Sequence, residues 1–120
     1  MKVLIIDDDA DIRFVAAMSL RAGGAIDVVE ASGGLDGVCK AREEQPDVIL
    51  LDMMMPTMDG SQTIAALRMQ TETATTPVIF LTAKTIVAEI QGMKDLGAVG
   101  VLIKPFDPRT LAADLLALLT

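Results

Sequence analysis

The sequence has no histidine, tryptophan or tyrosine, and it has one cysteine among 120 residues. Without histidine, the chain has no imidazole of its own to act as a base, a metal ligand or a phosphoryl carrier. Without tryptophan and tyrosine, it lacks the usual side chains on which nucleic-acid bases stack. Cys39 alone cannot form an internal disulfide, so we expect a reducing, cytoplasmic environment.

Long apolar runs and an excess of basic residues are also missing. Apolar residues make up 52% of the chain, but they stand in short blocks, well below the roughly 18 residues of a membrane span. The N-terminal block ends in acids, which is not the pattern of a signal peptide. The net charge of −7 argues against direct binding to nucleic acid or to an anionic membrane, because no basic patch is available. The length predicts a single domain, residues 1–120.

Five short apolar blocks have the composition of strands, at residues 3–6, 27–31, 48–51, 78–82 and 101–103. All but the second are continuous rather than alternating, which is typical of strands covered by helices on both faces. The segments between the blocks have the apolar spacing of helices. Five strand–helix repeats predict an α/β fold, a doubly wound (βα)5 five-stranded parallel sheet with right-handed crossovers.

Individual residues are predicted to shape the helices. Asp9 and Asp11 fall at the start of the first helix, where acids cap the chain and favour the helix dipole. Asp107 and Pro108 have the order of an N-cap and a first helical residue, so they predict the start of the last helix. Cys39 lies on an apolar helical stripe and is predicted to fill the core.

Reactive polar residues end four of the predicted strands. Asp7 and Asp8 follow the first, Asp52 follows the third, Thr82 ends the fourth and Lys104 follows the fifth. Ligands of an open parallel sheet bind outside the carboxyl ends of its strands, so these side chains are predicted to converge. Three carboxylates with no histidine or thiolate beside them suit Mg²⁺ or Mn²⁺. Because a carboxylate can also attack phosphorus, the set predicts phosphoryl transfer onto an aspartate.

Four segments carry a resemblance to a known family: IIDDD, LLDMMMPTMDG, LTAK and IKPF. The second matches the signature D-x-x-M-P-x-M-D-G in full, from Asp52 to Gly60. On these segments the chain resembles the receiver domains of two-component response regulators, of the chemotaxis-regulator type, over essentially its whole length. The resemblance implies a flavodoxin-like sheet with strand order 2-1-3-4-5.

The resemblance also implies a Mg²⁺ site, in which Asp8 is a direct ligand and Asp7 acts largely through water. Asp52 and the backbone carbonyl of Met54 complete the protein ligands.

For the phosphoryl group, the resemblance implies that Asp52 is the acceptor, and that the donor is a sensor histidine kinase, a phosphotransfer protein or acetyl phosphate. Lys104 binds the phosphoryl oxygens, and Thr82 with the backbone of Ala83 engages them after transfer. The Lys104–Pro105 peptide is expected to be cis. Such a domain is not a conventional enzyme, but it catalyses its own phosphorylation and dephosphorylation.

Two alternatives remain open at this point. An aspartate-nucleophile phosphatase would use Asp7 and Asp9 as its D-x-D motif, but it leaves Asp52 and the M-P-x-M-D-G segment unexplained. A pseudo-receiver that only docks partners would not need the complete set of acids, Thr82 and Lys104.

The resemblance implies a downstream effector that binds a face made by the fourth helix, the strand at 101–103 and the fifth helix. Apolar residues surround that fifth helix, which predicts a partner surface or a weak homodimer, with extra burial within the domain as the alternative. Val101 stands where many relatives have an aromatic residue that rotates on activation. The segment AVGVLIK lacks the acidic pair and the aromatic residue of the DNA-binding branch, which favours another branch. Met54 has no amide to hold a water, which predicts a long-lived phosphorylated form.

Overall fold

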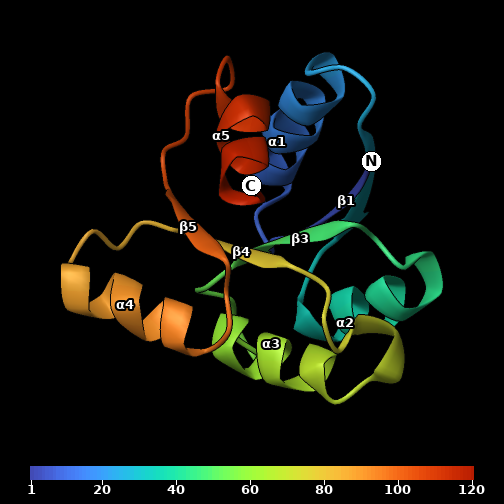
Figure 1. The fold of residues 1–120 in the computed structure, drawn as a ribbon, viewed down its shortest axis with the longest axis vertical. Coiled ribbons are helices and arrows are strands. Elements are labelled where there is room, and N and C mark those ends of the chain that lie inside the picture. The colour runs from blue at the N-terminus through green and yellow to red at the C-terminus, as the bar shows by residue number, and fades with distance from the viewer.

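The computed structural model describes residues 1–120. Strands and helices alternate along the chain, and the five strands form one parallel sheet (Figure 1). The strands are β1 (Lys2–Ile6), β2 (Asp27–Ala31), β3 (Val48–Asp52), β4 (Val78–Thr82) and β5 (Gly100–Ile103). The helices are α1 (Ala10–Ala22), α2 (Gly34–Glu44), α3 (Gly60–Arg68), α4 (Val87–Asp95) and α5 (Leu111–Leu118), with a 3₁₀ turn, η1 (Thr71–Thr73), before β4. The order β2-β1-β3-β4-β5 confirms the predicted fold and strand order.

The sheet lies between two helical layers. Helices α1 and α5 cover one face, and α2, α3 and α4 cover the other (Figure 1). Alternate residues of the strands enter two separate cores: Leu50 packs with Leu20 and Leu115 on the α1/α5 side, and Phe80 packs with Ile64 on the other side. Because the central strands are buried on both faces, their sequences are continuously apolar.

The register of the sheet brings the predicted site residues to one edge. Ile6 lies opposite Leu51 in the pairing of β1 with β3, so Asp7 and Asp52 come next at neighbouring positions. Thr82 lies opposite Ile103 in the pairing of β4 with β5, so Lys104 emerges beside the end of β4.

Helix α2 packs on the sheet through small residues. Its buried positions are Gly34, Gly37 and Ala41, whereas Cys39 is exposed, so the prediction that Cys39 fills the core is wrong. A Cβ atom at Gly37 would lie 2.5 Å from Cδ1 of Ile6, which shows how closely the helix backbone approaches β1. Of the larger apolar residues of α2, Val38 packs against this core, whereas Leu35 is exposed.

The last helix begins later than the sequence predicted. Oδ1 of Asp107 accepts the amide hydrogen of Arg109 at 2.9 Å, but the residues from Pro108 to Thr110 form a turn, and α5 starts at Leu111. None of the helices is both long enough and apolar enough to cross a membrane.

Candidate functional site

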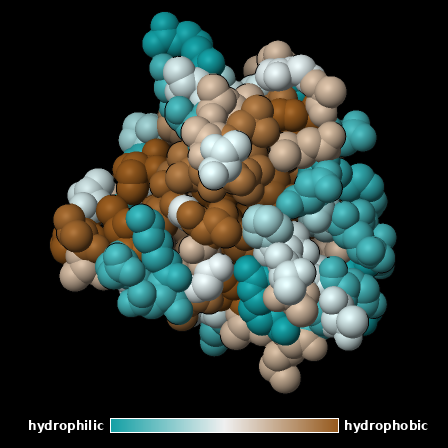
Figure 2. All heavy atoms as spheres, viewed as in Figure 1, coloured by the Kyte–Doolittle hydropathy of each residue, from teal (hydrophilic) through white to brown (hydrophobic).

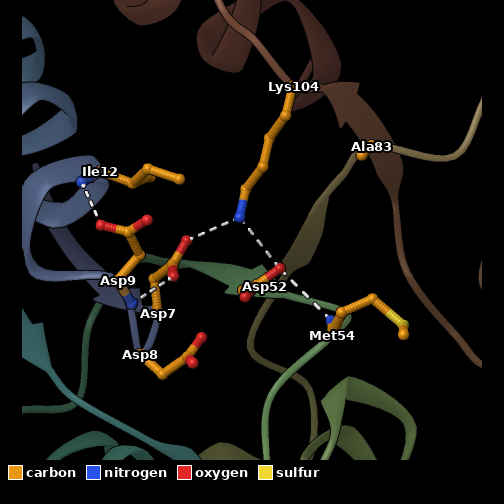
Figure 3. A pocket seen from close by; sticks show the side chains of 8 residues that line it. All are labelled: Asp7, Asp8, Asp9, Ile12, Asp52, Met54, Ala83 and Lys104. Atoms are coloured by element: carbon orange, nitrogen blue, oxygen red, sulfur yellow. Dashed lines mark hydrogen bonds and ion pairs between the residues drawn. The ribbon is translucent and has the colours of Figure 1, made fainter.

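Three carboxylates meet at the carboxyl edge of the sheet, as the sequence predicted. Asp7, Asp8 and Asp52 each offer one oxygen, and these oxygens lie within 4.8 Å of one another. Asp7 is fully buried and Asp52 is 4% exposed, whereas Asp8 is exposed. The carboxylates open into a cavity of about 240 Å³ (Figure 3). Its other lining residues are Asp9, Ile12, Met54, Ala83 and Lys104.

Lys104 reaches into this cavity from the end of β5 and bridges two of the acids (Figure 3). Its Nζ lies 3.0 Å from Oδ2 of Asp7 and 3.1 Å from Oδ1 of Asp52. The Lys104–Pro105 peptide is cis, as expected. One ammonium therefore partly neutralises two buried carboxylates.

The loop from β1 to α1 is held by its own aspartates. Oδ1 of Asp7 accepts the amide hydrogen of Asp9 at 2.9 Å. Oδ1 of Asp9 in turn accepts the amide hydrogens of Asp11 at 2.9 Å and Ile12 at 3.2 Å, so Asp9 is the N-cap of α1. Asp11 lies in the first turn of the helix. The predicted helix-starting roles of Asp9 and Asp11 are confirmed.

Burial changes the acidity of the central carboxyl group. It raises the pKa of Asp52 from 3.8 to about 6, and the negative charge of Asp7 acts in the same direction. The ammonium of Lys104 and the amide of Met54 oppose this rise without cancelling it. Burial lowers the pKa of Lys104, but its contact with Asp7 and the charges of Asp52 and Asp7 outweigh burial, so that pKa is raised.

The loop after β4 forms another side of the site. Ala83 lines the cavity, while Thr82 is buried at the end of the strand. The hydroxyl oxygen of Thr82 accepts the amide hydrogen of Lys84 at 3.1 Å. The side chain of Lys84 lies 3.4 Å from a carboxylate oxygen of Glu89 in α4. Lys84 therefore ties this loop to α4.

The segment after β3 is shaped by a capping box and a close approach. Oδ1 of Asp59 accepts the amide hydrogen of Gln62 at 2.9 Å, and the side chain of Gln62 accepts the amide hydrogen of Asp59 at 3.0 Å. A Cβ atom at Gly60 would lie 2.7 Å from Cα of Met53 and 2.9 Å from the carbonyl oxygen of Asp52. Asp59 and Gly60, the last two residues of the sequence signature, therefore fix the loop that follows Asp52.

Comparison with known proteins decides the family. The family model described as the response regulator receiver domain matches residues 3–116. The chain belongs to this family. Receiver domains are the phosphoacceptor modules of two-component signal transduction, which confirms the function that the resemblance implied.

The relatives of this receiver domain include long and short proteins. It is 42% identical over 119 residues to the DNA-binding dual master transcriptional regulator RpaA of Synechocystis, covering 98% of the chain and 48% of RpaA. It is 36% identical over 118 residues to protein PilH of Pseudomonas aeruginosa, covering 98% of the chain and 97% of PilH. The solved structure of the chemotaxis response regulator CheY4 of Vibrio cholerae matches with a TM-score of 0.90 and 38% identity, covering 98% of the chain and 97% of CheY4.

The receiver domain thus spans about half the length of the transcriptional regulator RpaA and nearly the whole length of PilH. Since both kinds of relative are similar to it, the expectation that it lies outside the DNA-binding branch stays a prediction.

The acid cluster of this receiver domain fits a hard divalent cation. Oδ2 of Asp7 is buried and makes no hydrogen bond, so the ion pair with Lys104 leaves it with unused lone pairs. All donors of the cluster are oxygens, which suits Mg²⁺, the cation that receiver domains generally use.

One contact with the site has no signal in the sequence. The guanidinium of Arg13 donates a hydrogen bond to the backbone carbonyl of Asp7 at 2.7 Å. Helical spacing places Arg13 one turn beyond the acid-rich loop, but it does not say that a long side chain folds back onto that loop.

Proposed function

We propose that Asp52 of this receiver domain is the phosphoacceptor, and that its phosphorylation switches the binding of a downstream partner. The observation that carries the proposal is a buried carboxylate, held by Lys104, at the carboxyl edge of a receiver fold. The donor is a phosphohistidine of a sensor kinase or of a phosphotransfer protein, and acetyl phosphate can replace it.

In the reaction, a carboxylate oxygen of Asp52 forms a bond to phosphorus while the bond from phosphorus to the donor nitrogen, or to the acetate oxygen, breaks. Oδ1 of Asp52 already accepts the amide hydrogen of Met54 at 3.3 Å and pairs with Lys104. The other oxygen, Oδ2, makes no protein hydrogen bond and is therefore the one available for attack. The leaving histidine nitrogen keeps its electron pair and takes a proton from water.

The residues around Asp52 have separate tasks. Lys104 leaves its carboxylate partners and binds the transferred phosphoryl oxygens. The hydroxyl of Thr82 and the amide of Ala83 donate to these oxygens after transfer. Asp7, Asp8, Asp52 and the Met54 carbonyl would hold Mg²⁺, which when bound neutralises charge on the phosphoryl group.

The phosphatase alternative conflicts with the loop geometry. It needs a free carboxylate at Asp9 to act as the acid of a D-x-D pair. The Asp9 carboxylate instead accepts the amide hydrogens of Asp11 and Ile12 at the start of α1, and Figure 3 shows the one from Ile12. It is therefore committed to capping the helix.

The apolar surface of α4, β5 and α5 supports a partner site on this face. Figure 2 shows apolar residues running from the start of α4 across β5 to α5. The exposed apolar residues of this surface are Ile86, Val87, Ile103 and Leu116. Because Lys84 ties the loop after Thr82 to Glu89 of α4, a change at Thr82 has a direct route to this surface.

Phosphorylation in vitro tests whether Asp52 is the acceptor. Incubation with Mg²⁺ and acetyl phosphate should add one phosphoryl mass to the protein, and Asp52→Asn should abolish the addition. Asp47→Asn, at the other end of β3, is the matched control and should leave it unchanged. Phosphorylation of the Asp52→Asn variant would mean that another carboxylate is the acceptor.

The output face is tested by light scattering with and without beryllofluoride, which mimics the phosphoryl group. A rise in mass would identify self-association, and an unchanged mass would leave a different protein as the partner.

A further inference from the structure

Arg13 links three elements around the acid-rich loop. It belongs to α1, its Nη1 donates to the carbonyl oxygen of Asp7 at 2.7 Å, and its Nε lies 3.6 Å from a carboxylate oxygen of Glu30 in β2. Its side chain is 18% exposed, so the guanidinium is held largely inside the protein. The guanidinium of Arg13 thus connects helix α1, the loop after β1 and the edge strand β2.

The carbonyl that Arg13 binds belongs to the peptide unit between Asp7 and Asp8. Because a peptide unit is planar, a fixed carbonyl oxygen also fixes the direction in which the Asp8 backbone leaves it. The Asp8 carboxylate is exposed and accepts no hydrogen bond in the structure, unlike that of Asp7, which accepts the amide hydrogen of Asp9. The backbone is therefore what places the Asp8 carboxylate in the acid cluster.

We propose that Arg13 is a positioning residue for the divalent cation, acting on Asp8 through the Asp7 carbonyl. The inference rests on the cation site of the proposed function. Two effects of Arg13 oppose each other here. Its positive charge disfavours a second cation nearby, although Glu30 offsets part of that charge. Its hydrogen bond orders the loop that supplies two ligands, and supporting contacts of this kind contribute tenfold or more to metal affinity. We infer that positioning outweighs charge.

The direction in which Mg²⁺ affinity changes in an Arg13 variant separates the two effects. The affinity of the unphosphorylated protein for Mg²⁺ alone is measured by titration calorimetry for the parent, Arg13→Met and Arg13→Lys. Arg13→Met should weaken binding about tenfold, although it removes a positive charge. Arg13→Lys keeps the charge but loses the planar guanidinium, so its Mg²⁺ affinity should lie between those of the parent and Arg13→Met.

Arg21 offers a matched control on the same helix. Its Nη2 donates to the carbonyl of Val28 in β2 at 3.3 Å, so Arg21→Met also removes a charge and a contact between α1 and β2. It should leave Mg²⁺ affinity at the parent value, whereas Asp8→Asn should lose it.

Tighter or unchanged Mg²⁺ binding by Arg13→Met would overturn the proposal. If Arg13→Met does not fold, as judged by circular dichroism without Mg²⁺, Arg13→Lys decides: the parent affinity in that variant would also overturn it. An equal loss in Arg21→Met would reduce the role of Arg13 to general support of the fold and would contradict the proposal. Because no phosphoryl donor is present, these outcomes are independent of whether Asp52 is the acceptor.

Discussion

Strand β3 has an aspartate at each end, and the two have opposite surroundings. Asp47 precedes it at the amino edge of the sheet, where it is exposed. Oδ2 of Asp47 accepts the amide hydrogen of Lys2 at 2.6 Å, and the Asp47 amide donates to the Lys2 carbonyl at 2.8 Å. Asp52 ends the strand at the carboxyl edge, where it is buried beside Asp7 and has Lys104 as its only cationic partner.

The difference shows how one residue type supports the fold at one edge and prepares chemistry at the other. At the amino edge, water and a backbone amide stabilise the charge of Asp47. At the carboxyl edge, burial and a neighbouring acid work against the charge of Asp52, which raises its pKa. An oxygen-rich pocket with poorly compensated negative charge is what a divalent cation can relieve. Substitutions at the two edges should therefore have effects of different size and sign.

Removing the lysine of each edge should have unequal effects. Lys104→Met leaves two buried carboxylates facing each other, so we expect it to lower the free energy of unfolding by about 3 kcal/mol at pH 7.5 without Mg²⁺. Lys2→Met breaks an exposed ion pair with Glu44, for which we expect a loss of at most about 1 kcal/mol. Urea titration measures both. Equal losses would contradict the contrast between the edges.

Neutralising the acid of the carboxyl edge should stabilise the protein. The pKa of Asp52 is raised in the folded state, so the native protein binds more protons than the unfolded chain between about pH 4 and 6, and stability falls as pH rises through this window. At pH 7.5, Asp52→Asn should therefore be more stable than the parent by about 2 kcal/mol, because Lys104 keeps Asp7 as a partner. At pH 4 the gain should disappear. A variant that is less stable than the parent at pH 7.5 would show that the Asp52 charge is stabilising.

Met54, an exposed residue that lines the cavity beside Asp52, should control the lifetime of the phosphorylated form. Met54 is 64% exposed beside Asp52 and has no polar group to align a water for hydrolysis. Met54→Asn supplies an amide, so we expect decay after donor removal to become about tenfold faster, which corresponds to about 1.4 kcal/mol in the barrier. Mass measurement over time gives the rate. Decay no faster than that of the parent would show that Met54 does not prolong the lifetime of the phosphorylated form.

The same aspartate-to-asparagine change at the amino edge should have a small effect of opposite sign. Asp47→Asn replaces a charged acceptor of the Lys2 amide with a neutral one, so we expect a loss of roughly 0.5 kcal/mol at pH 7.5. Urea titration in parallel with Asp52→Asn gives the comparison. A gain in stability at both ends of β3 would mean that net charge, rather than burial, decides the outcome.

The carboxyl edge could be predicted from the sequence to a large extent. The buried strands are continuous apolar blocks, and the polar residue at the end of each block lies at one edge because parallel strands share a direction. The convergence of Asp7, Asp8, Asp52 and Lys104 follows from these two facts together with the strand order 2-1-3-4-5, which the family resemblance implied.

Side-chain reach and close packing could not be predicted in this way. Gly37 packs against β1 because it lacks a side chain, which no apolar periodicity records, and Cys39 is therefore exposed. Arg13 reaches back to Asp7 and Lys84 reaches forward to Glu89, and both contacts depend on the finished fold. The predicted start of α5 is wrong because the residues after Asp107 form a turn before the helix begins at Leu111.

Chemical trapping tests most directly whether the buried edge carries the acceptor. Borohydride reduces an aspartyl phosphate to the alcohol, which leaves homoserine at the modified position. After phosphorylation by acetyl phosphate with Mg²⁺, peptide mass spectrometry should find homoserine at position 52 and aspartate at positions 7, 8 and 47. Homoserine at any of those three positions, with Asp52 unchanged, would contradict the account.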